Sequence, residues 1–114
     1  MRELWDLVVI GGGASGLAAA VIASELGDHV LVLDKNAAVG RKIAASGNGR
    51  CNLMNTNRLK YYGESFFAEE VLNAFPPEQI ARFWEDLGLG LSEESDGRIY
   101  PFTRQISCGL QITL

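Results

Sequence analysis

The stretch "DLVVIGGGASGLAAAVIASELGDHVLVLD", residues 6–34, decides the fold of this 114-residue chain. Its first five residues form a short β-branched run that ends abruptly in glycine, which is typical of a buried strand. The alanine-rich segment 14–27 predicts a helix that stops at Gly27, and residues 29–34 predict a second strand. Because both strands are apolar on each face, we expect an α/β fold in which they lie parallel in a βαβ unit.

The glycines between the first strand and the helix have the spacing of a phosphate-binding turn. Gly11 permits a tight turn, Gly13 lets the backbone approach a pyrophosphate, and Gly16 lets the helix press on the sheet. Free N–H groups at the start of the helix would then face the anion. Asp34 ends the next strand, 18 residues after Gly16, where its carboxylate would accept hydrogen bonds from an adenosine ribose. The pattern predicts a dinucleotide site. The acid disfavours NADP and leaves NAD and FAD as alternatives.

Positive charge is concentrated behind that acid. Residues 35–63 contain six cations and no acid, although the whole chain has a net charge of −4. The concentration indicates either a solvated basic face or an anionic ligand, and because the chain is acidic overall we expect no nucleic-acid partner. An NAD dehydrogenase of the usual design would have a second helix and a third strand close behind the acid. A basic, glycine-spaced segment instead suits a ligand that lies extended, with its pyrophosphate and a large ring system both covered.

Cysteine usage and hydropathy exclude several classes of protein. The two cysteines have neither the number nor the spacing of a disulfide framework or a metal site, so we expect no metal and a reduced, cytoplasmic protein. Residues 7–24 carry no charge and imitate a signal peptide or a membrane span. Four glycines interrupt that stretch and two acids precede it, so we expect neither a signal peptide nor a membrane association.

The second half of the chain predicts helices and a hairpin. Residues 65–75 and 77–88 have helical patterns whose aromatic residues are expected to lie in the core. The stretch "LGLSEESDGRIYPF", residues 89–102, predicts a β-hairpin with its turn at "SDG". We therefore expect a dinucleotide-binding βαβ unit with its loop in residues 1–64. Residues 65–114 would hold the helical segment and the incomplete start of an inserted second domain.

Three motifs together resemble a known family. "VIGGGASGLAAA" (residues 9–20), "GRKIAASGNGRCN" (residues 40–52) and "DGRIYP" (residues 96–101) are similar to the bacterial FAD flavoproteins that include aminoacetone oxidase and a bile-acid-reducing flavoenzyme. The resemblance implies the N-terminal part of a Rossmann-like FAD-binding domain in a longer oxidoreductase. The flavin of that enzyme would pass hydride to or from a small organic substrate, with NAD(P)H as the candidate electron donor.

The resemblance also implies where the cofactor lies. Glycines at 47 and 49 would admit a planar ring, and Arg50 is the candidate charge contact to the flavin or the substrate; no catalytic residue is assigned. Asp34 stands where members usually carry glutamate, which shortens the reach to the ribose but keeps the chemistry. The implied FAD contacts are Gly11, Gly13, Ala14, Ser15, Gly16, Asp34, Lys35, Arg41 and Lys42, and on the flavin side Ser46, Gly47, Gly49, Arg50, Cys51 and Asn52.

Two alternatives stay open beside the FAD enzyme. The chain could be an NAD-binding Rossmann module of a dehydrogenase, because the phosphate turn serves both cofactors. It could also be a truncated product without independent activity, because only two parallel strands are evident where a doubly wound sheet needs more. We expect the 114-residue fragment alone to be inactive, and the patterns do not predict an oligomeric state.

Overall fold

The computed structural model describes residues 3–57 and 61–102, and the chain divides into two compact units, Met1–Ala45 and Ser46–Leu114. The division that we predicted after residue 64 falls inside the second unit, and as a division of function it stays a prediction. Three features of the sequence lie outside the described residues: Cys108, two of the six cations in residues 35–63, and the end of the expected second domain.

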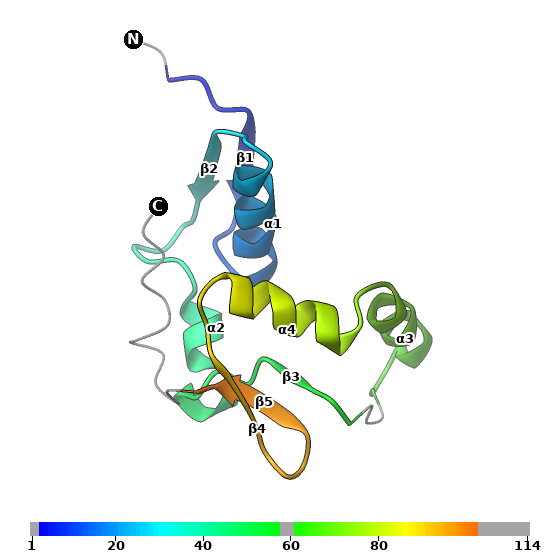
Figure 1. Ribbon diagram of the computed structural model, residues 1–114. Coiled ribbons are helices and arrows are strands. Elements are labelled where there is room, and N and C mark those ends of the chain that lie inside the picture. The colour runs from blue at the N-terminus through cyan, green and yellow to red at the C-terminus, as the bar shows by residue number, and fades with distance from the viewer. Residues whose placement is uncertain (1–2, 58–60, 103–114) are drawn as a thin grey trace. The chain divides into compact units, whose positions relative to one another are not determined.

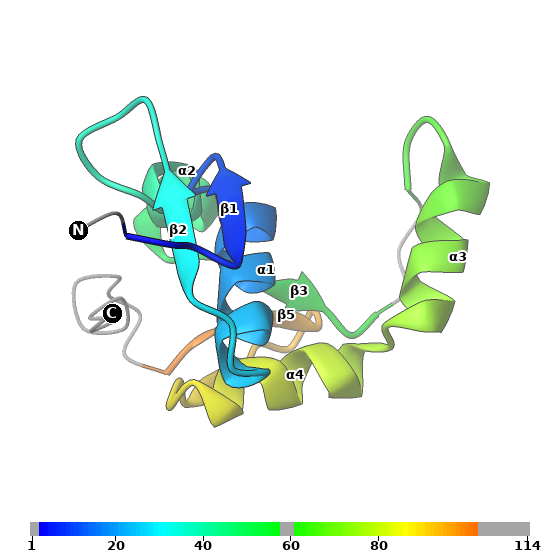
Figure 2. The same cartoon turned by 90° about the horizontal axis from the view of Figure 1, so that it is seen from above.

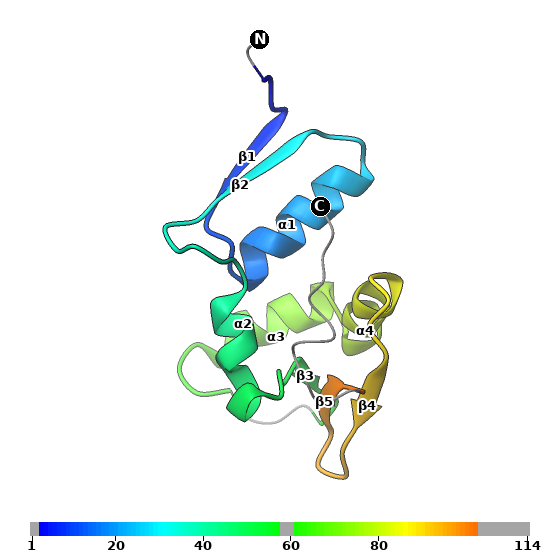
Figure 3. The same ribbon diagram turned by 90° about the vertical axis from the view of Figure 1, so that its left-hand side faces the viewer.

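The first unit is a parallel βαβ arrangement. The strands β1 (Leu7–Ile10) and β2 (Val30–Leu33) pair in parallel, with Leu7 opposite Val30 and Ile10 opposite Leu33, and helix α1 (Ala14–Glu25) lies between them in the sequence. Helix α1 lies along the two strands (Figures 1 and 3), and it is buried there at alanines, whose small side chains allow close packing. The predicted parallel βαβ start of the fold is therefore confirmed. The elements are β1 (Leu7–Ile10), α1 (Ala14–Glu25), β2 (Val30–Leu33) and α2 (Arg41–Ala45).

Helix α1 ends in a glycine turn, as the sequence predicts. Gly27 has a φ of +98°, a conformation that residues with a side chain rarely adopt. Its N–H donates to the carbonyl of Ser24 at 3.0 Å, and the N–H of Asp28 donates to the carbonyl of Ala23 at 3.1 Å. These two bonds satisfy carbonyls that the helix end would otherwise leave unpaired, and they turn the chain back toward β2.

The second unit contains a small antiparallel sheet and two helices. The strand order is β3–β5–β4, and the N–H of Gly97 closes the hairpin by donating to the carbonyl of Glu94 at 2.9 Å. The predicted hairpin and both predicted helices are confirmed. We did not predict β3, whose two residues are too few for an alternating pattern. The elements are η1 (Ser46–Gly49), β3 (Met54–Asn55), α3 (Ser65–Ala74), α4 (Pro77–Asp86), β4 (Leu91–Glu93) and β5 (Arg98–Pro101).

The core of the second unit is small and lies at the sheet. Among the described residues of this unit, the buried ones include Ile99, Tyr100, Pro101 and Cys51. Within the same unit, α3 stands apart from the sheet (Figures 1 and 2), and its Phe66 and Phe67 are 71% and 65% exposed. The prediction that the aromatic residues of this helix lie in the core is therefore wrong in the structure, because the described part of the chain leaves the apolar side of α3 largely exposed. Over residues 3–57 and 61–102, the helices are too short or too polar to cross a membrane.

Candidate cofactor-binding site

The turn between β1 and α1 requires glycine at two positions for different reasons. Gly11 has a φ of +102°, and its N–H extends the parallel ladder by donating to the carbonyl of Leu33 at 2.7 Å. At Gly16 a Cβ atom would lie 1.9 Å from the carbonyl oxygen of Gly11, a distance that no side chain tolerates. Helix α1 can therefore begin close to the end of β1 only because both residues lack a side chain.

The space in front of Gly13 is open. A Cβ atom at this residue would meet nothing within 4 Å, and its φ of −84° is available to any residue. Gly13 is the N-cap of α1, and it makes no side-chain cap hydrogen bond. The first N–H groups of the helix, including those of Ala14 and Ser15, have no acceptor within the helix. The turn thus offers unpaired donors beside open space, which is what an anionic pyrophosphate requires.

Gly12, which the sequence analysis did not single out, connects the turn to the segment after β2. Gly12 is buried, and a Cβ atom there would lie 2.4 Å from Cγ1 of Val39. Its carbonyl accepts a hydrogen bond from the N–H of Gly40 at 2.7 Å. The sequence did contain a signal for this role: the GxGxxG pattern requires glycine at positions 11, 13 and 16, so it does not explain why position 12 is also glycine.

Asp34 lies beside this turn, as its place at the end of the second strand predicts. Its Oδ2 accepts a hydrogen bond from the N–H of Gly12 at 2.8 Å. Its Oδ1 accepts from the backbone N–H of Asn36 at 2.7 Å and from the side-chain Nδ2 of Asn36 at 2.9 Å. The hydrogen bonds from Asn36 and Gly12 hold the pKa of the Asp34 carboxyl below its usual range, so the group is ionised at neutral pH.

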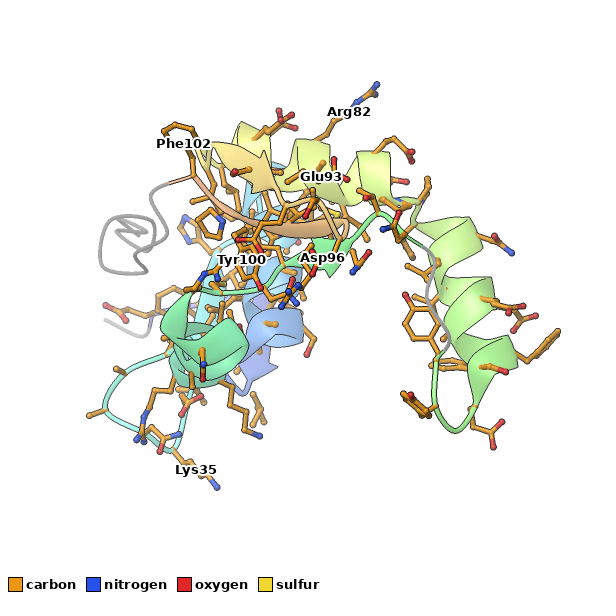
Figure 4. All side chains as sticks on the ribbon, turned by 90° about the horizontal axis from the view of Figure 1, so that it is seen from below. Lys35, Arg82, Glu93, Asp96, Tyr100 and Phe102 are labelled. Atoms are coloured by element: carbon orange, nitrogen blue, oxygen red, sulfur yellow. The ribbon has the colours of Figure 1, made fainter. Side chains whose placement is uncertain are left out.

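The cations near Asp34 are exposed, and among the described residues Arg41 has a hydrogen-bond partner. Nη1 of Arg41 donates to Oδ1 of Asn36 at 3.0 Å. Lys35 and Lys42 are exposed, and the side chain of Lys35 points away from the ribbon (Figure 4). The first unit therefore brings the phosphate turn and Asp34 together and leaves the basic residues free to contact an anion from solvent.

The loop of residues 46–52, in the second unit, has a left-handed backbone. Gly47, Asn48 and Gly49 have φ values of +57°, +58° and +79°, and Cys51 follows at +59°. A Cβ atom at Gly47 would lie 2.6 Å from the backbone nitrogen of Asn52. Such a run of left-handed residues is costly for any residue except glycine, and conformations of this kind cluster at functional sites.

Within that loop, Cys51 is a core residue. Its side chain is 5% exposed, and its N–H donates to the carbonyl of Ser46 at 3.0 Å. Burial raises the pKa of the Cys51 thiol, although a hydrogen bond with Ser46 partly opposes this effect. A buried thiol with a raised pKa is a poor nucleophile at neutral pH, so the thiol of Cys51 contributes packing in this structure.

Arg50 is attached to the hairpin. Its guanidinium forms an ion pair with Glu94 and lies over the ring of Tyr100, 4.1 Å from the ring centroid. Tyr100 is buried on β5, in the hairpin region that Figure 4 labels. The loop backbone continues along the same strand, since the N–H of Leu53 donates to the carbonyl of Ile99 at 2.9 Å. Glu94 and Tyr100 are partners of Arg50 that sequence reasoning did not find, because 44 and 50 residues separate them from it.

The fold and the turn define a Rossmann-type dinucleotide-binding domain. The chain matches the HI0933-like protein Rossmann domain over residues 5–112, and it belongs to this family. The Rossmann-like α/β fold and the family that we recognised from the sequence are thereby confirmed, and so is FAD as the cofactor. The open space at Gly13, the unpaired helix donors and the ionised Asp34 fit such a cofactor.

Three curated relatives show how far the similarity reaches. The chain is 40% identical to 3-dehydro-bile acid delta(4,6)-reductase of Clostridium scindens in an alignment 109 residues long, which covers 91% of this chain and 26% of that protein. It is 43% identical over 53 residues to ribosomal RNA dihydrouridine synthase of Escherichia coli, covering 46% of the chain and 13% of the relative. It is 47% identical over 47 residues to thioredoxin reductase of Ureaplasma parvum, covering 41% and 15%. The chain spans at most about a quarter of each of these relatives.

Proposed function

We propose that the enzyme containing this domain is an FAD-dependent oxidoreductase that transfers hydride to or from a small organic substrate. The observation that carries the proposal is the juxtaposition of the open phosphate turn at Gly13 with the ionised carboxylate of Asp34. Bound FAD supplies a ring that accepts or donates hydride, and the protein supplies binding, orientation and charge.

Each implied contact has a role in this proposal. The N–H groups at the start of α1 bind the pyrophosphate, and Asp34 binds the adenosine ribose. Arg41 and Lys42 add positive charge along the phosphates. The loop of residues 46–52 forms the wall beside the flavin ring, and Arg50 brings its charge to the flavin or the substrate. The rigid attachment of Arg50 to the hairpin supports this role, because a fixed charge stabilises an anion better than a mobile one.

The names of the relatives favour the direction of reduction. The bile acid enzyme and the thioredoxin enzyme are reductases by name, and dihydrouridine is a reduced form of uridine. We therefore propose a reductase that takes electrons from NAD(P)H and reduces a carbon–carbon double bond conjugated to a carbonyl group. We also propose that the enzyme is cytoplasmic and that residues 1–114 have no activity without the rest of the protein.

Structured RNA is the second candidate substrate. The similarity to the ribosomal RNA dihydrouridine synthase favours it, as does the concentration of six cations without an acid in residues 35–63. Our expectation from the sequence was that the protein has no nucleic-acid partner, because its net charge is −4. Uridine in RNA also contains a double bond conjugated to a carbonyl group, so the chemistry proposed for the flavin is the same for both substrates.

The test uses the purified full-length enzyme. It should be yellow, with absorbance near about 450 nm, and should release FAD on denaturation. NADH or NADPH should bleach this absorbance under anaerobic conditions, and an unsaturated steroid ketone should restore it. Ribosomal RNA lacking dihydrouridine is assayed in parallel by mass spectrometry, which separates the two substrates. If neither substrate is reduced although the flavin is, the proposed substrate class fails, and fast oxidation by O₂ with no acceptor reduced would contradict the direction proposed.

A further inference from the structure

The carboxylate of Asp34 accepts three hydrogen bonds from its own chain. A carboxylate has about four lone-pair positions, two on each oxygen. Oδ1 uses both of its positions on Asn36, through the backbone N–H at 2.7 Å and the side-chain Nδ2 at 2.9 Å. Oδ2 uses one position on the N–H of Gly12 at 2.8 Å. With the partners that the described residues supply, one acceptor position, on Oδ2, remains for a ligand.

Asn36 is itself oriented by its neighbours. Its amide has a donor end and an acceptor end, and the partners on the two sides determine which way it points. The Nδ2 group donates to Asp34, and Oδ1 accepts from Nη1 of Arg41 at 3.0 Å. The chain Arg41–Asn36–Asp34 therefore has one consistent direction of hydrogen bonding from the guanidinium to the carboxylate.

We propose that Asn36 is a positioning residue for the cofactor: held by Arg41, it turns the Asp34 carboxylate so that a single Oδ2 acceptor faces the ribose. This inference rests on the proposed assignment of Asp34 to the adenosine ribose. It adds that Asp34 binds one ribose hydroxyl. It also adds that the orientation of the carboxylate depends on Asn36, a residue that would not itself contact the cofactor. Asn36 and Arg41 are both exposed, so they act on Asp34 through hydrogen bonds and contribute little to the packing of the core.

The pH dependence of FAD binding can distinguish this positioning role of Asn36 from a merely structural one, because the role acts through the charge of Asp34. Among the residues that the structure describes, Lys35 acts on Asp34 by charge, and Arg41 acts through Asn36. The β1–α1 turn contributes only the uncharged N–H of Gly12. Loss of the Asn36 amide should therefore raise the pKa of Asp34 toward its ordinary value, and FAD binding should weaken at a higher pH than in the wild type.

The experiment measures the FAD dissociation constant of the full-length enzyme as a function of pH. Asn36→Ala should weaken FAD binding about three- to tenfold at neutral pH, the effect of one hydrogen bond, and should move the acid limb of the profile to higher pH. Asn36→Asp keeps the size of the side chain but replaces the donor by a negative charge, so it should move the acid limb further. Ala37→Ser, in the same exposed segment, is the matched control and should leave both quantities unchanged.

Asp34→Ala separates the two levels of the inference. It should weaken FAD binding more than Asn36→Ala does, roughly ten- to a hundredfold, because a charge-assisted bond is lost. If Asp34→Ala leaves FAD affinity unchanged, the ribose assignment fails. If Asp34→Ala weakens FAD binding while Asn36→Ala does not, or while the acid limb of both Asn36 variants stays in place, the positioning role of Asn36 is overturned.

Discussion

The phosphate turn of the first unit and the loop of residues 46–52 in the second unit are both rich in glycine, but they are held in different ways. The turn is stabilised by backbone hydrogen bonds within a βαβ unit, among them those of Gly11 with Leu33 and of Gly12 with Gly40. The loop has backbone hydrogen bonds of its own, such as that of Cys51 with Ser46, but side chains also attach it to a distant hairpin, through the ion pair of Arg50 with Glu94 and its contact with Tyr100. Glycine spacing alone therefore describes the turn well and the loop poorly.

The largest effect that we expect is a loss of stability at Gly16 that its neighbour in the turn, Gly13, does not share. Gly16→Ala places a Cβ atom 1.9 Å from the carbonyl oxygen of Gly11, so α1 must shift away from β1. The loss of stability should be about 3 kcal/mol, the upper part of the range for overpacking. Thermal unfolding measures it. Gly13→Ala is the matched control, since its Cβ atom would meet nothing within 4 Å, and equal melting temperatures for the two variants would contradict the packing role of Gly16.

A larger side chain at Gly13 should remove the cofactor without unfolding the protein. Gly13→Val points into the open space in front of the turn, where we expect the pyrophosphate, and its φ of −84° suits valine. The full-length variant should therefore purify without FAD while its melting temperature in the absence of FAD matches that of the wild-type apoprotein. Absorbance and FAD release are the measurements. Stoichiometric FAD in a well-folded variant would show that the pyrophosphate does not lie there.

The next effect tests how the loop is held. Arg50→Ala removes an ion pair and a cation–π contact that are partly exposed, so it should cost about 1–2 kcal/mol. Arg82→Ala is the control, because Arg82 points away from α4 into solvent (Figure 4) and its loss should cost less than about 0.5 kcal/mol. A double-mutant cycle with Glu94→Gln measures the coupling energy between Arg50 and Glu94. No difference between the two arginine variants would contradict the contact with the hairpin.

The same variant tests the proposed place of the loop beside the flavin. If the charge of Arg50 reaches the reduced flavin, Arg50→Ala should lower the reduction potential by about 30–65 mV, which corresponds to roughly 1.5–3 kcal/mol. Potentiometric titration of the full-length enzyme measures this change. A lower melting temperature with an unchanged potential would assign Arg50 to holding the loop alone.

The smallest effect concerns Cys51. Because the thiol is 5% exposed and burial raises its pKa, iodoacetamide should label it very slowly at neutral pH in the folded protein. Labelling should become fast only when the protein is unfolded in urea. The measurement is mass spectrometry of the peptide that contains Cys51, which reports the labelling of this thiol separately from that of any other. Rapid labelling of the folded protein would restore Cys51 as a candidate reactive thiol.

Much of the first unit could be predicted because its determinants are local. The strands, the helix, its glycine stop at Gly27 and the acid at position 34 all lie within one continuous pattern, and their hydrogen bonds follow from it. Position 36 escaped prediction because an exposed asparagine after a strand is usually only a turn residue. The aromatic side chains of α3 were misplaced because a helical apolar pattern shows that a face exists and does not show what covers it.

The amino-acid sequence by itself determined the βαβ unit and the phosphate turn, since glycine spacing and strand periodicity act over short distances along the chain. That spacing left NAD and FAD open, and the resemblance of three motifs to a flavoprotein family added FAD. Only the tertiary structure decided that Asp34 accepts a hydrogen bond from Gly12, 22 residues away, and that Cys51 is buried. It also decided that Arg50 is paired with Glu94, 44 residues away. The physical reason is that a side chain's partners depend on which distant segments pack beside it, and local propensity carries no information about that packing.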